Sequence, residues 1–439
     1  MAMDERVLGL LVFGGALVVL LSGIPIWAGL AAVSVACVVL LEPHLLTTLP
    51  HVFHDSMDSF ALLAIPLFIL LSAPIAASRA SRDLYEALHR WMHKLPGGLG
   101  ISTMIASGIF AALCGSSPAT AAAIGGIGIP EMRRRGYPAS LACGLIAHAG
   151  TFGILIPPSI TMILYGVATE TSIGKCFIAG IVPGLLEVVL SCVWVGFYFR
   201  FVARKPQGPR REEEHFTLRE KIEYLPRVLP FLFIIFGIMG SLYGGWATPS
   251  EAAGVGAVLS CLTVAVLYRI RGWAEWRDIL LKALNDSSMI LMIMAAALVF
   301  SWVCSYLYVT QSLAEMLLGL PLGKWGIFVL INVLLLILGF FIPPAAVILM
   351  VAPMLLPVVE GLGWDPVWFA VIMTVNLEIG LVTPPVGLNL YIVKGIAPDV
   401  PLSQVLWGVL PFVIIELVVI GLVAAFPQLA LWLPNQMIG

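Results

Sequence analysis

The sequence has few charged residues, and this scarcity excludes most classes of soluble protein. Only 11% of the 439 residues are charged whereas 60% are hydrophobic; a soluble domain has about 25% charged and 45–50% apolar residues. The formal net charge of −2 gives no preference for a polyanion or polycation. The composition therefore excludes a soluble enzyme, a nucleic-acid-binding protein and a disordered chain, and it indicates an all-α polytopic membrane protein surrounded by lipid.

Several functional motifs are also absent. The seven cysteines lie in apolar segments without a CxxC pair, so we expect small buried side chains and no disulfides or metal ligands. No GxxxxGK[ST] loop and no HExxH helix occur. We therefore expect no cofactor, and any transport must be driven by energy from elsewhere. The acidic start lacks the basic region of a secretory leader, so Leu8–Leu21 is interpreted as the first membrane span.

The positions of the basic residues predict the topology. Of 23 Lys and Arg, 19 fall in four stretches, near 79–94, 133–135, 200–227 and 269–282, which the positive-inside rule places in the cytoplasm. We predict ten crossings and two re-entrant hairpins, with both termini external. The predicted spans are 8–22, 25–42, 59–78, 138–168, 176–199, 228–243, 249–268, 283–309, 365–395 and 403–433.

The apolar segment Leu99–Met132 lies between two of these cytoplasmic stretches, so it cannot be a single crossing. As one helix its 34 residues would extend ~51 Å at about 1.5 Å per residue, far more than the ~30 Å hydrocarbon core. Its middle, Gly115–Thr120, combines helix breakers with hydroxyl groups. We predict a re-entrant hairpin over 99–132 and a second one near 325–360. Irregular backbone at that depth needs protein or a water-filled cavity around it.

Landmarks of the first half recur in the second at nearly constant spacing, which predicts an internal repeat. The offset is 224 residues for Pro25 and Pro249, 226 for Pro118 and Pro344, and 227 for the segments 153–158 (GILIPP) and 380–385 (GLVTPP). We predict a first repeat at 1–203, a cytoplasmic connector at 204–227 and a second repeat at 228–439. Five crossings per half is an odd number, so the second half is inverted, as in many secondary transporters.

Each half contains a double proline within a predicted span, which indicates a broken helix at 138–168 and at 365–395. Proline removes an N–H group and clashes with the carbonyl four residues earlier, so carbonyls at Gly153–Ile156 and Gly380–Thr383 become free to bind a ligand. Sodium is bound by such neutral oxygens, and half-helix N-termini favour a carboxylate. Side-chain oxygens nearby come from Ser116, Ser117, Thr120, Ser159, Thr161, Thr383 and Asn389.

A few charged or titratable residues lie within the predicted spans. Glu378 is either a functional acid or a brace that accepts backbone N–H bonds near the second break. His148 is interpreted as a buried histidine with its hydrogen bonds satisfied, rather than a proton or substrate contact. Glu187, Glu251 and Glu416 lie nearer span ends, where they face the interface or a partner subunit, and none is assigned to the site.

At these residues the sequence resembles a known family, the large membrane subunit (DctM type) of tripartite ATP-independent periplasmic (TRAP) transporters. The similarity extends along essentially the whole chain. It rests on GSSPATAAAIGGIGIPEMRRRGYP (115–138), GILIPPSITMILYGVATETSIGK (153–175), WATPSEAAGVGA (246–257) and GLVTPPVGLNLYIVKGIA (380–397), supported by LAIPLFIL (63–70).

The resemblance implies sodium-coupled uptake of an organic acid, delivered by a periplasmic substrate-binding protein, in the bacterial inner membrane. It also implies a small four-helix membrane partner (DctQ type), here expected as a separate chain, and an elevator-type motion. The hairpin tips and unwound helices would form the sites. The implied sodium ligands are Gly115, Ser116, Gly153, Ile156, Pro157, Gly339, Gly380, Thr383 and Glu378; the implied substrate contacts are Ser117, Thr120, Ser159, Thr161, Asn389 and Pro344.

The second tip departs from the family pattern, because this chain has Ile342-Pro343-Pro344 where many members carry an acidic residue. We therefore expect backbone carbonyls as the ligands there. Two alternatives remain open. One is a stand-alone sodium–carboxylate symporter with the same hairpin architecture. The other is an intramembrane enzyme, for which we find no paired acid cluster, metal helix or nucleophile–base pair at membrane depth in the sequence.

Overall fold

The predicted all-helical architecture is confirmed. The computed structural model describes residues 5–202, 216–223 and 225–437, and within these ranges there is no strand. Eight of the described helices are long and apolar enough to cross a membrane, or up to nine if the bent pair Ala139–Leu155 and Ile160–Ala168 forms one span. The predicted ten spans are defined differently, because the eight include both arms of the second hairpin and exclude three shorter helices. Those three are α1 (Glu5–Leu21), α2 (Ile26–Leu41) and α18 (Pro366–Val382).

The first half of the chain continues from α1 and α2 through eight further α-helices, two of which were not predicted. The unexpected helices are α3 (Leu49–Met57) and α5 (Ala80–Met92), both too short or too polar to stand out as spans. The others are α4 (Ala64–Ala77), α6 (Gly98–Cys114), α7 (Ser117–Arg134), α8 (Ala139–Leu155), α9 (Ile160–Ala168) and α10 (Ile173–Phe197).

The second half has a similar series of helices. Only part of the predicted connector 204–227 can be described, because 203–215 and 224 lie outside the described residues; the part that can includes α11 (Leu218–Glu223). The helices that accompany α18 are α12 (Leu225–Tyr243), α13 (Pro249–Leu267), α14 (Trp273–Tyr306), α15 (Val309–Leu318), α16 (Gly323–Phe341), α17 (Pro344–Gly361), α19 (Leu388–Ile396), α20 (Leu402–Ala425) and α21 (Gln428–Leu431). The predicted span at 283–309 overlaps most of α14, which begins ten residues earlier, at Trp273, and ends at Tyr306.

Helices α16–α20 follow one another in the same order as α6–α10. Helix α6 begins at Gly98 and α16 at Gly323, which is 225 residues later; α10 begins at Ile173 and α20 at Leu402, 229 residues later. The two segments predicted as hairpins are each a pair of helices in contact, α6 with α7 and α16 with α17. The opposite orientation of the two halves in the membrane stays a prediction.

Several helix ends follow directly from local sequence. Asp365 is the N-cap of α18, where its carboxylate accepts hydrogen bonds from the N–H groups of Val367 and Trp368. Thr248 and Glu251 form a capping box at the start of α13. Prolines occupy the first turns of α7 and α17, where a missing N–H breaks no helical bond. These residues fix where the chain re-enters a helix after each break.

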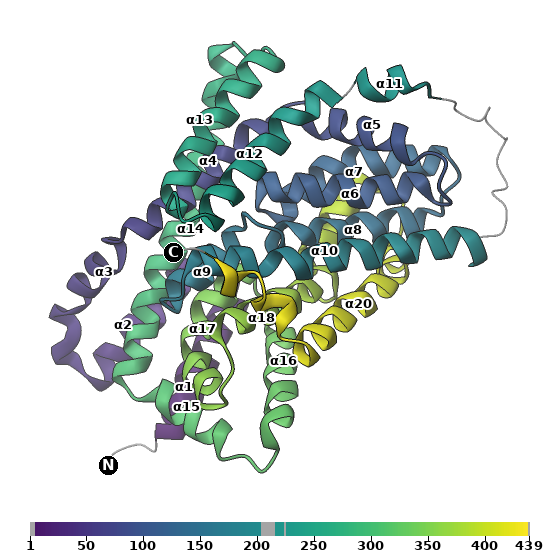
Figure 1. Ribbon diagram of the computed structural model, residues 1–439. Helices are drawn as coiled ribbons and strands as arrows, with labels where there is room; N and C mark the ends of the chain where they lie inside the picture. Colours follow the sequence, from purple (N-terminus) through teal and green to yellow (C-terminus); the bar gives the residue numbers. More distant parts are fainter. Residues whose placement is uncertain (1–4, 203–215, 224, 438–439) are drawn as a thin grey trace.

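The helices pack in two groups (Figure 1). Helices α6–α10 and α16–α20 contact one another extensively, through pairs such as α7 with α8, α8 with α20 and α18 with α20. Helices α2, α4, α13 and α14 form a second set of contacts beside them, and α4 and α14 reach the first group at α6 and α17. Both hairpins and both broken helices therefore belong to the same packed group.

Candidate functional site

The first hairpin tip is the short break between α6 and α7. Gly115 ends α6 with a positive φ of 58°, which glycine adopts without steric penalty. Its carbonyl accepts a hydrogen bond from the Ile160 N–H at 3.4 Å, and a Cβ at this position would lie 2.7 Å from the carbonyl oxygen of Pro158. The first tip is therefore packed directly on the first broken helix, as predicted.

The first break separates α8 from α9, whose axes differ by 42°. It contains a cis peptide bond between Pro157 and Pro158. Gly153 lies in the last turn of α8, and a Cβ there would lie 2.6 Å from the carbonyl oxygen of Ser116 in the first tip. The Ser159 hydroxyl donates to the Ile154 carbonyl and accepts from the Met162 N–H, so it caps α9. Ser159 thus stabilises the break as well as lying next to it.

The second tip and second break repeat this contact. A Cβ on Gly380 would lie 2.6 Å from the carbonyl oxygen of Gly339, and the Val386 N–H donates to the Phe340 carbonyl at 3.3 Å. The Thr383 hydroxyl donates to the Ile379 carbonyl at 2.6 Å. A cavity of about 80 Å³ lies between the two segments, lined by residues 339–343, 380–381 and 386–388.

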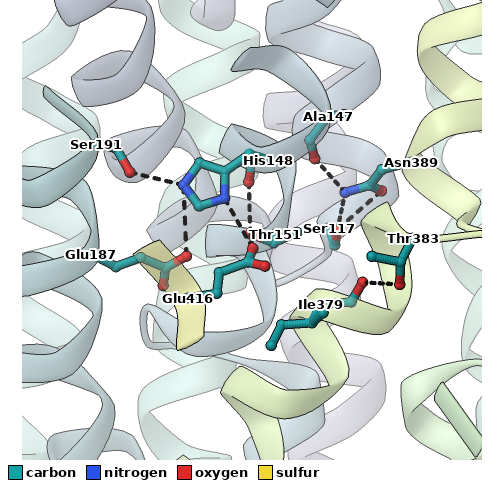
Figure 2. Close-up of polar contacts among 10 residues, drawn as sticks. All are labelled: Ser117, Ala147, His148, Thr151, Glu187, Ser191, Ile379, Thr383, Asn389 and Glu416. Atoms are coloured by element: carbon teal, nitrogen blue, oxygen red, sulfur yellow. Dashed lines mark hydrogen bonds and ion pairs between the residues drawn. The ribbon is translucent and has the colours of Figure 1, made fainter. Parts of the chain in front are cut away.

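One side chain links the two halves of the site. Asn389, in the first turn of α19, donates from Nδ2 to the Ala147 carbonyl at 2.8 Å and lies 2.9 Å from the Ser117 hydroxyl (Figure 2). The Ser117 hydroxyl is also 3.1 Å from Asn389 Oδ1. Both side chains are fully buried. The second broken helix is therefore hydrogen-bonded to the first hairpin tip and to α8.

The structure brings most of the predicted site residues together at the tips and breaks, while their roles as ligands stay predictions. Thr120 is buried in α7 and its hydroxyl donates to the Ser116 carbonyl. Thr161 is buried in the first turn of α9, Ile156 and Pro157 lie in the first break, and Pro344 opens α17 at the second tip. Glu378 is the exception. Its carboxyl group lies beside that of Glu187, and the negative charge of Glu416 also acts on it.

The helix ends give the site its electrostatic character. Helices α7, α9, α17 and α19 begin at the tips and breaks, so their N-termini carry partial positive charge there. Helices α6, α8, α16 and α18 end at the same places, where their C-termini carry partial negative charge. The tip and break segments contain no Lys or Arg. The arrangement offers carbonyl oxygens to cations and N–H groups to an anion.

The sequence interpretation missed a cluster of titratable residues behind this site. His148, Glu187 and Glu416 place ligand-type atoms within 4.8 Å of one another, and all three are fully buried. The statement that no acid cluster occurs at membrane depth is therefore wrong, and so is the placement of Glu187 and Glu416 at an interface. Three different helices bring these residues together only through tertiary packing.

The predictions for His148 and Glu378 have different outcomes. His148 is confirmed as a buried histidine with both ring nitrogens hydrogen-bonded, to Glu416 and Ser191. Glu378 does not brace the second break, because neither of its carboxylate oxygens accepts a hydrogen bond from a backbone N–H group among the described residues. A sequence signal was available: Glu187 and Glu416 each follow a Gly-x-x-Pro segment, 180–183 and 408–411, in the last long helix of their half.

Comparison with known proteins agrees with this geometry. Residues 13–429 match the family model described as the DctM component of tripartite ATP-independent periplasmic transporters. The C4-dicarboxylate TRAP transporter large permease of Pseudomonas aeruginosa is 39% identical over 91% of this chain and 92% of its own. The sialic acid TRAP transporter large permease of Vibrio cholerae is 32% identical over 97% of this chain and 98% of its own.

A solved structure shows a similar fold. The YdaH transporter of Alcanivorax borkumensis superposes with a TM-score of 0.63, covering 88% of this chain and 90% of its own, at 16% sequence identity. The named relatives are permeases, which supports a non-enzyme assignment. The apolar helices and the family match are those of a multi-pass protein of the bacterial inner membrane. The chain belongs to the DctM family, the large permease subunits of tripartite ATP-independent periplasmic transporters.

Proposed function

We propose that this permease carries out sodium-coupled uptake of a small organic acid anion. Sodium ions bind first to the carbonyl and hydroxyl oxygens at the tips and breaks, and the anion then docks on the adjoining helix N-termini. The loaded hairpins and broken helices move together against the second helix group, in an elevator-type cycle. A membrane potential contributes ~2.3 kcal/mol per net charge per 100 mV, so an excess of sodium over substrate charge drives accumulation.

The observation that carries this proposal is the contact of each hairpin tip with its own broken helix. Gly153 packs on the Ser116 carbonyl, and Gly380 packs on the Gly339 carbonyl. An ion that binds the carbonyls of one break therefore touches the neighbouring tip as well. Asn389 joins the second break to the first tip. Binding of an ion or substrate in one half can therefore affect the other half as well.

Two protein partners are part of the proposal. Family members work with a periplasmic substrate-binding protein and a small membrane subunit, and this chain is expected to do the same. The small subunit is either a separate chain or a fused one: an isethionate TRAP transporter permease of Oleidesulfovibrio alaskensis is a DctMQ protein, 34% identical, of which this chain covers 65%. Lipid contacts the exposed apolar faces of the outer helices.

The substrate class is proposed from chemistry and from relatives. The relatives named for C4-dicarboxylate, sialic acid and isethionate all bear the name of an organic anion. Helix N-termini and bound sodium would balance the negative charge of such a molecule. Mass spectrometry of the ligand that copurifies with the cognate binding protein would identify the acid.

The test is uptake into proteoliposomes that contain the permease, the small subunit and the binding protein. With radiolabelled succinate, sialic acid and isethionate as probes, one anion accumulates only when an inward sodium gradient is present. Ser116→Leu and Thr383→Leu abolish that uptake because each places a bulky side chain at a tip or break, whereas Ser116→Ala and Thr383→Ser retain part of it. Sodium-independent uptake in the unaltered protein would contradict the proposal. Sodium-dependent uptake without any binding protein would instead indicate a stand-alone symporter.

A further inference from the structure

Four helices of the packed group contribute the buried acid cluster, which we define as His148 of α8, Glu187 of α10, Glu378 of α18 and Glu416 of α20. All four side chains have no solvent exposure. Figure 2 shows His148 between Glu187 and Glu416, with Ser191 on the side of the ring away from Glu416. The rings of Phe152 and Phe412 pack against the imidazole, at 5.1 and 4.9 Å between centroids. The cluster is therefore sealed by apolar side chains.

The imidazole has its hydrogen bonds, but most of the carboxylate oxygens do not. His148 Nδ1 lies 2.9 Å from Glu416 Oε1, and Nε2 lies 2.8 Å from the Ser191 hydroxyl and 3.8 Å from Glu187 Oε1. Both oxygens of Glu187, both of Glu378 and Oε2 of Glu416 lack a hydrogen-bond partner in the described residues. Five of the six carboxylate oxygens of the cluster are therefore buried without a hydrogen-bond donor.

The charges in the cluster do not balance. Three carboxylates and one imidazolium sum to −2, and a neutral imidazole leaves −3. Helices α8, α18 and α20 contain no Lys or Arg, and Lys175 of α10 is 12 residues from Glu187, or ~18 Å along a helix at about 1.5 Å per residue. Burying unpaired carboxylates is strongly unfavourable, so positive charge must enter the cluster.

Within the described ranges, no Lys or Arg forms an ion pair with a carboxylate of the cluster, whose ion pairs are with His148. Three basic side chains on helices packed around the cluster lie near helix ends and have other partners. Lys394 donates to the carbonyls of Pro398 and Val400, Arg133 pairs with Asp399, and Lys324 lies over the Trp364 ring. Helices α6 and α9 carry no charged residue. Any compensating positive charge must therefore come from outside these helices, as a proton or a metal cation.

The cluster lies where the two halves of the chain meet. Glu187 and Glu416 occupy similar places in α10 and α20, after Gly180–Pro183 and Gly408–Pro411 respectively. Glu378 lies two residues before Gly380, the residue that packs on the second tip. Thr151 holds the same place before Gly153, and its hydroxyl donates to Glu416 Oε1 at 3.4 Å. An ion bound in the cluster would therefore influence both breaks through the residues that lie next to them.

We propose that the buried acid cluster is an exchangeable monovalent-cation site, separate from the site at the tips and breaks. Its ligand is a small ion that carboxylate oxygens hold, either Na⁺ or H⁺. A transition metal fits poorly, because hydrogen bonds already occupy both imidazole nitrogens. The hard carboxylate oxygens suit Na⁺, and a proton on one of these buried, unpaired carboxylates would equally remove a negative charge. Either ion lowers the negative charge of the cluster, and its release restores the repulsion between the acids.

The first measurement separates the two ions. It uses the full chain in lipid nanodiscs, without substrate or binding protein, and counts bound ²²Na⁺ in the unaltered protein and in the Glu187→Gln/Glu378→Gln/Glu416→Gln variant. If the ion is Na⁺, the triple variant binds one fewer sodium per chain. If it is H⁺, the sodium count is unchanged. The unaltered protein then shows an infrared carbonyl stretch of protonated carboxyl groups at neutral pH, where exposed acids are ionised, which disappears at higher pH and is missing from the variant.

Controls and the contrary outcome follow from the same design. The three single Glu→Gln variants keep the shape of each side chain, so each supports the proposal if it shifts either signal in a folded protein. Glu360→Gln removes an exposed carboxylate at the end of α17 and changes neither signal. The proposal is overturned if the triple variant binds as many sodium ions as the unaltered protein and the carboxyl signal changes neither with pH nor with Na⁺. Because no substrate is used, this result is independent of whether sodium drives uptake.

Discussion

Asn389 and Ser117 are 272 residues apart in the chain, yet their side chains hydrogen-bond each other at the centre of the candidate site. Asn389 also holds the Ala147 carbonyl at 2.8 Å. A side chain that bridges the second broken helix, the first hairpin tip and α8 makes the two halves one structural unit. Under the proposed mechanism, this linkage would let ions and substrate at either half act on a common movement.

Replacing this asparagine tests the linkage. Asn389→Ala leaves the Ala147 carbonyl and the Ser117 hydroxyl buried without their partner, which costs about 1–3 kcal/mol. We expect a lower melting temperature in detergent, and reduced uptake because the second broken helix is no longer tied to the first tip. Asn285→Ala, at an exposed position of α14, is the matched control and should change neither value. Normal uptake by Asn389→Ala would show that the bridge is dispensable.

The contact of each tip with its break depends on two glycines. Gly153→Ala and Gly380→Ala each place a methyl group 2.6 Å from a carbonyl oxygen of the facing tip, and real side chains do not approach backbone so closely. We expect both variants to lose sodium-dependent uptake, because the tip is displaced from the break. Gly126→Ala, in α7, has no atom within 4 Å of the new methyl group and should transport normally. Equal activity of all three variants would contradict the proposed tip–break site.

Sequence reasoning found the tips and breaks because local chemistry marks them. A double proline interrupts a helix wherever it occurs, and Gly115-Ser116 with Pro118 breaks an apolar segment too long for one crossing. Local sequence therefore places the ends of α8 and α18 to within a few residues. The arms of the first hairpin were predicted from the length of an apolar segment between two basic stretches, and the second hairpin follows from the repeat that matches Pro118 with Pro344.

The buried acid cluster could not be found in this way. Glu187 and Glu416 are separated by more than half of the chain, and each looks like an isolated acid near a span end. Only the packing of α8, α10, α18 and α20 shows that both face His148. The short helices α3 and α5 were missed because their composition resembles that of polar connections. Long-range convergence and short amphipathic segments carry no strong local signal.

The crossing of α8 and α20 makes a prediction about stability. A Cβ on Gly408 would overlap the Ser140 carbonyl, and a Cβ on Gly144 would overlap the backbone of Gly408. Gly408→Ala forces the two helices apart, and we expect a loss of at least about 1–3 kcal/mol, as for overpacked cores. Gly421→Ala, in the same helix, meets nothing within 4 Å and should be neutral or stabilising by up to about 1 kcal/mol. Comparing the melting temperatures of the two variants checks this prediction, and equal values would show that the crossing tolerates separation.

A salt bridge between the halves gives a prediction with a defined pH dependence. At the end of α7, Arg133 makes two hydrogen bonds to Asp399, at 3.0 and 2.6 Å, in the segment before α20. The hydrogen bonds from Arg133 lower the pKa of Asp399 from its ordinary 3.8. A lowered acid pKa means that the pair stabilises the fold fully above pH 3.8 and loses this contribution as pH falls through the lower, folded-state pKa.

Arg133→Glu should therefore lower the melting temperature at pH 7, where it faces Asp399 with a like charge, and Arg133→Glu/Asp399→Arg should recover part of the loss. The screening of exposed charges makes the effect of Arg133→Gln smaller and sensitive to salt. In strong acid, where Asp399 is protonated in both states, the unaltered protein and Arg133→Gln should melt alike. Thermal melts at neutral and acidic pH measure all of these differences. If Arg133→Glu/Asp399→Arg melts at the same temperature as Arg133→Glu alone, the contact does not hold the two halves together, although it is well formed.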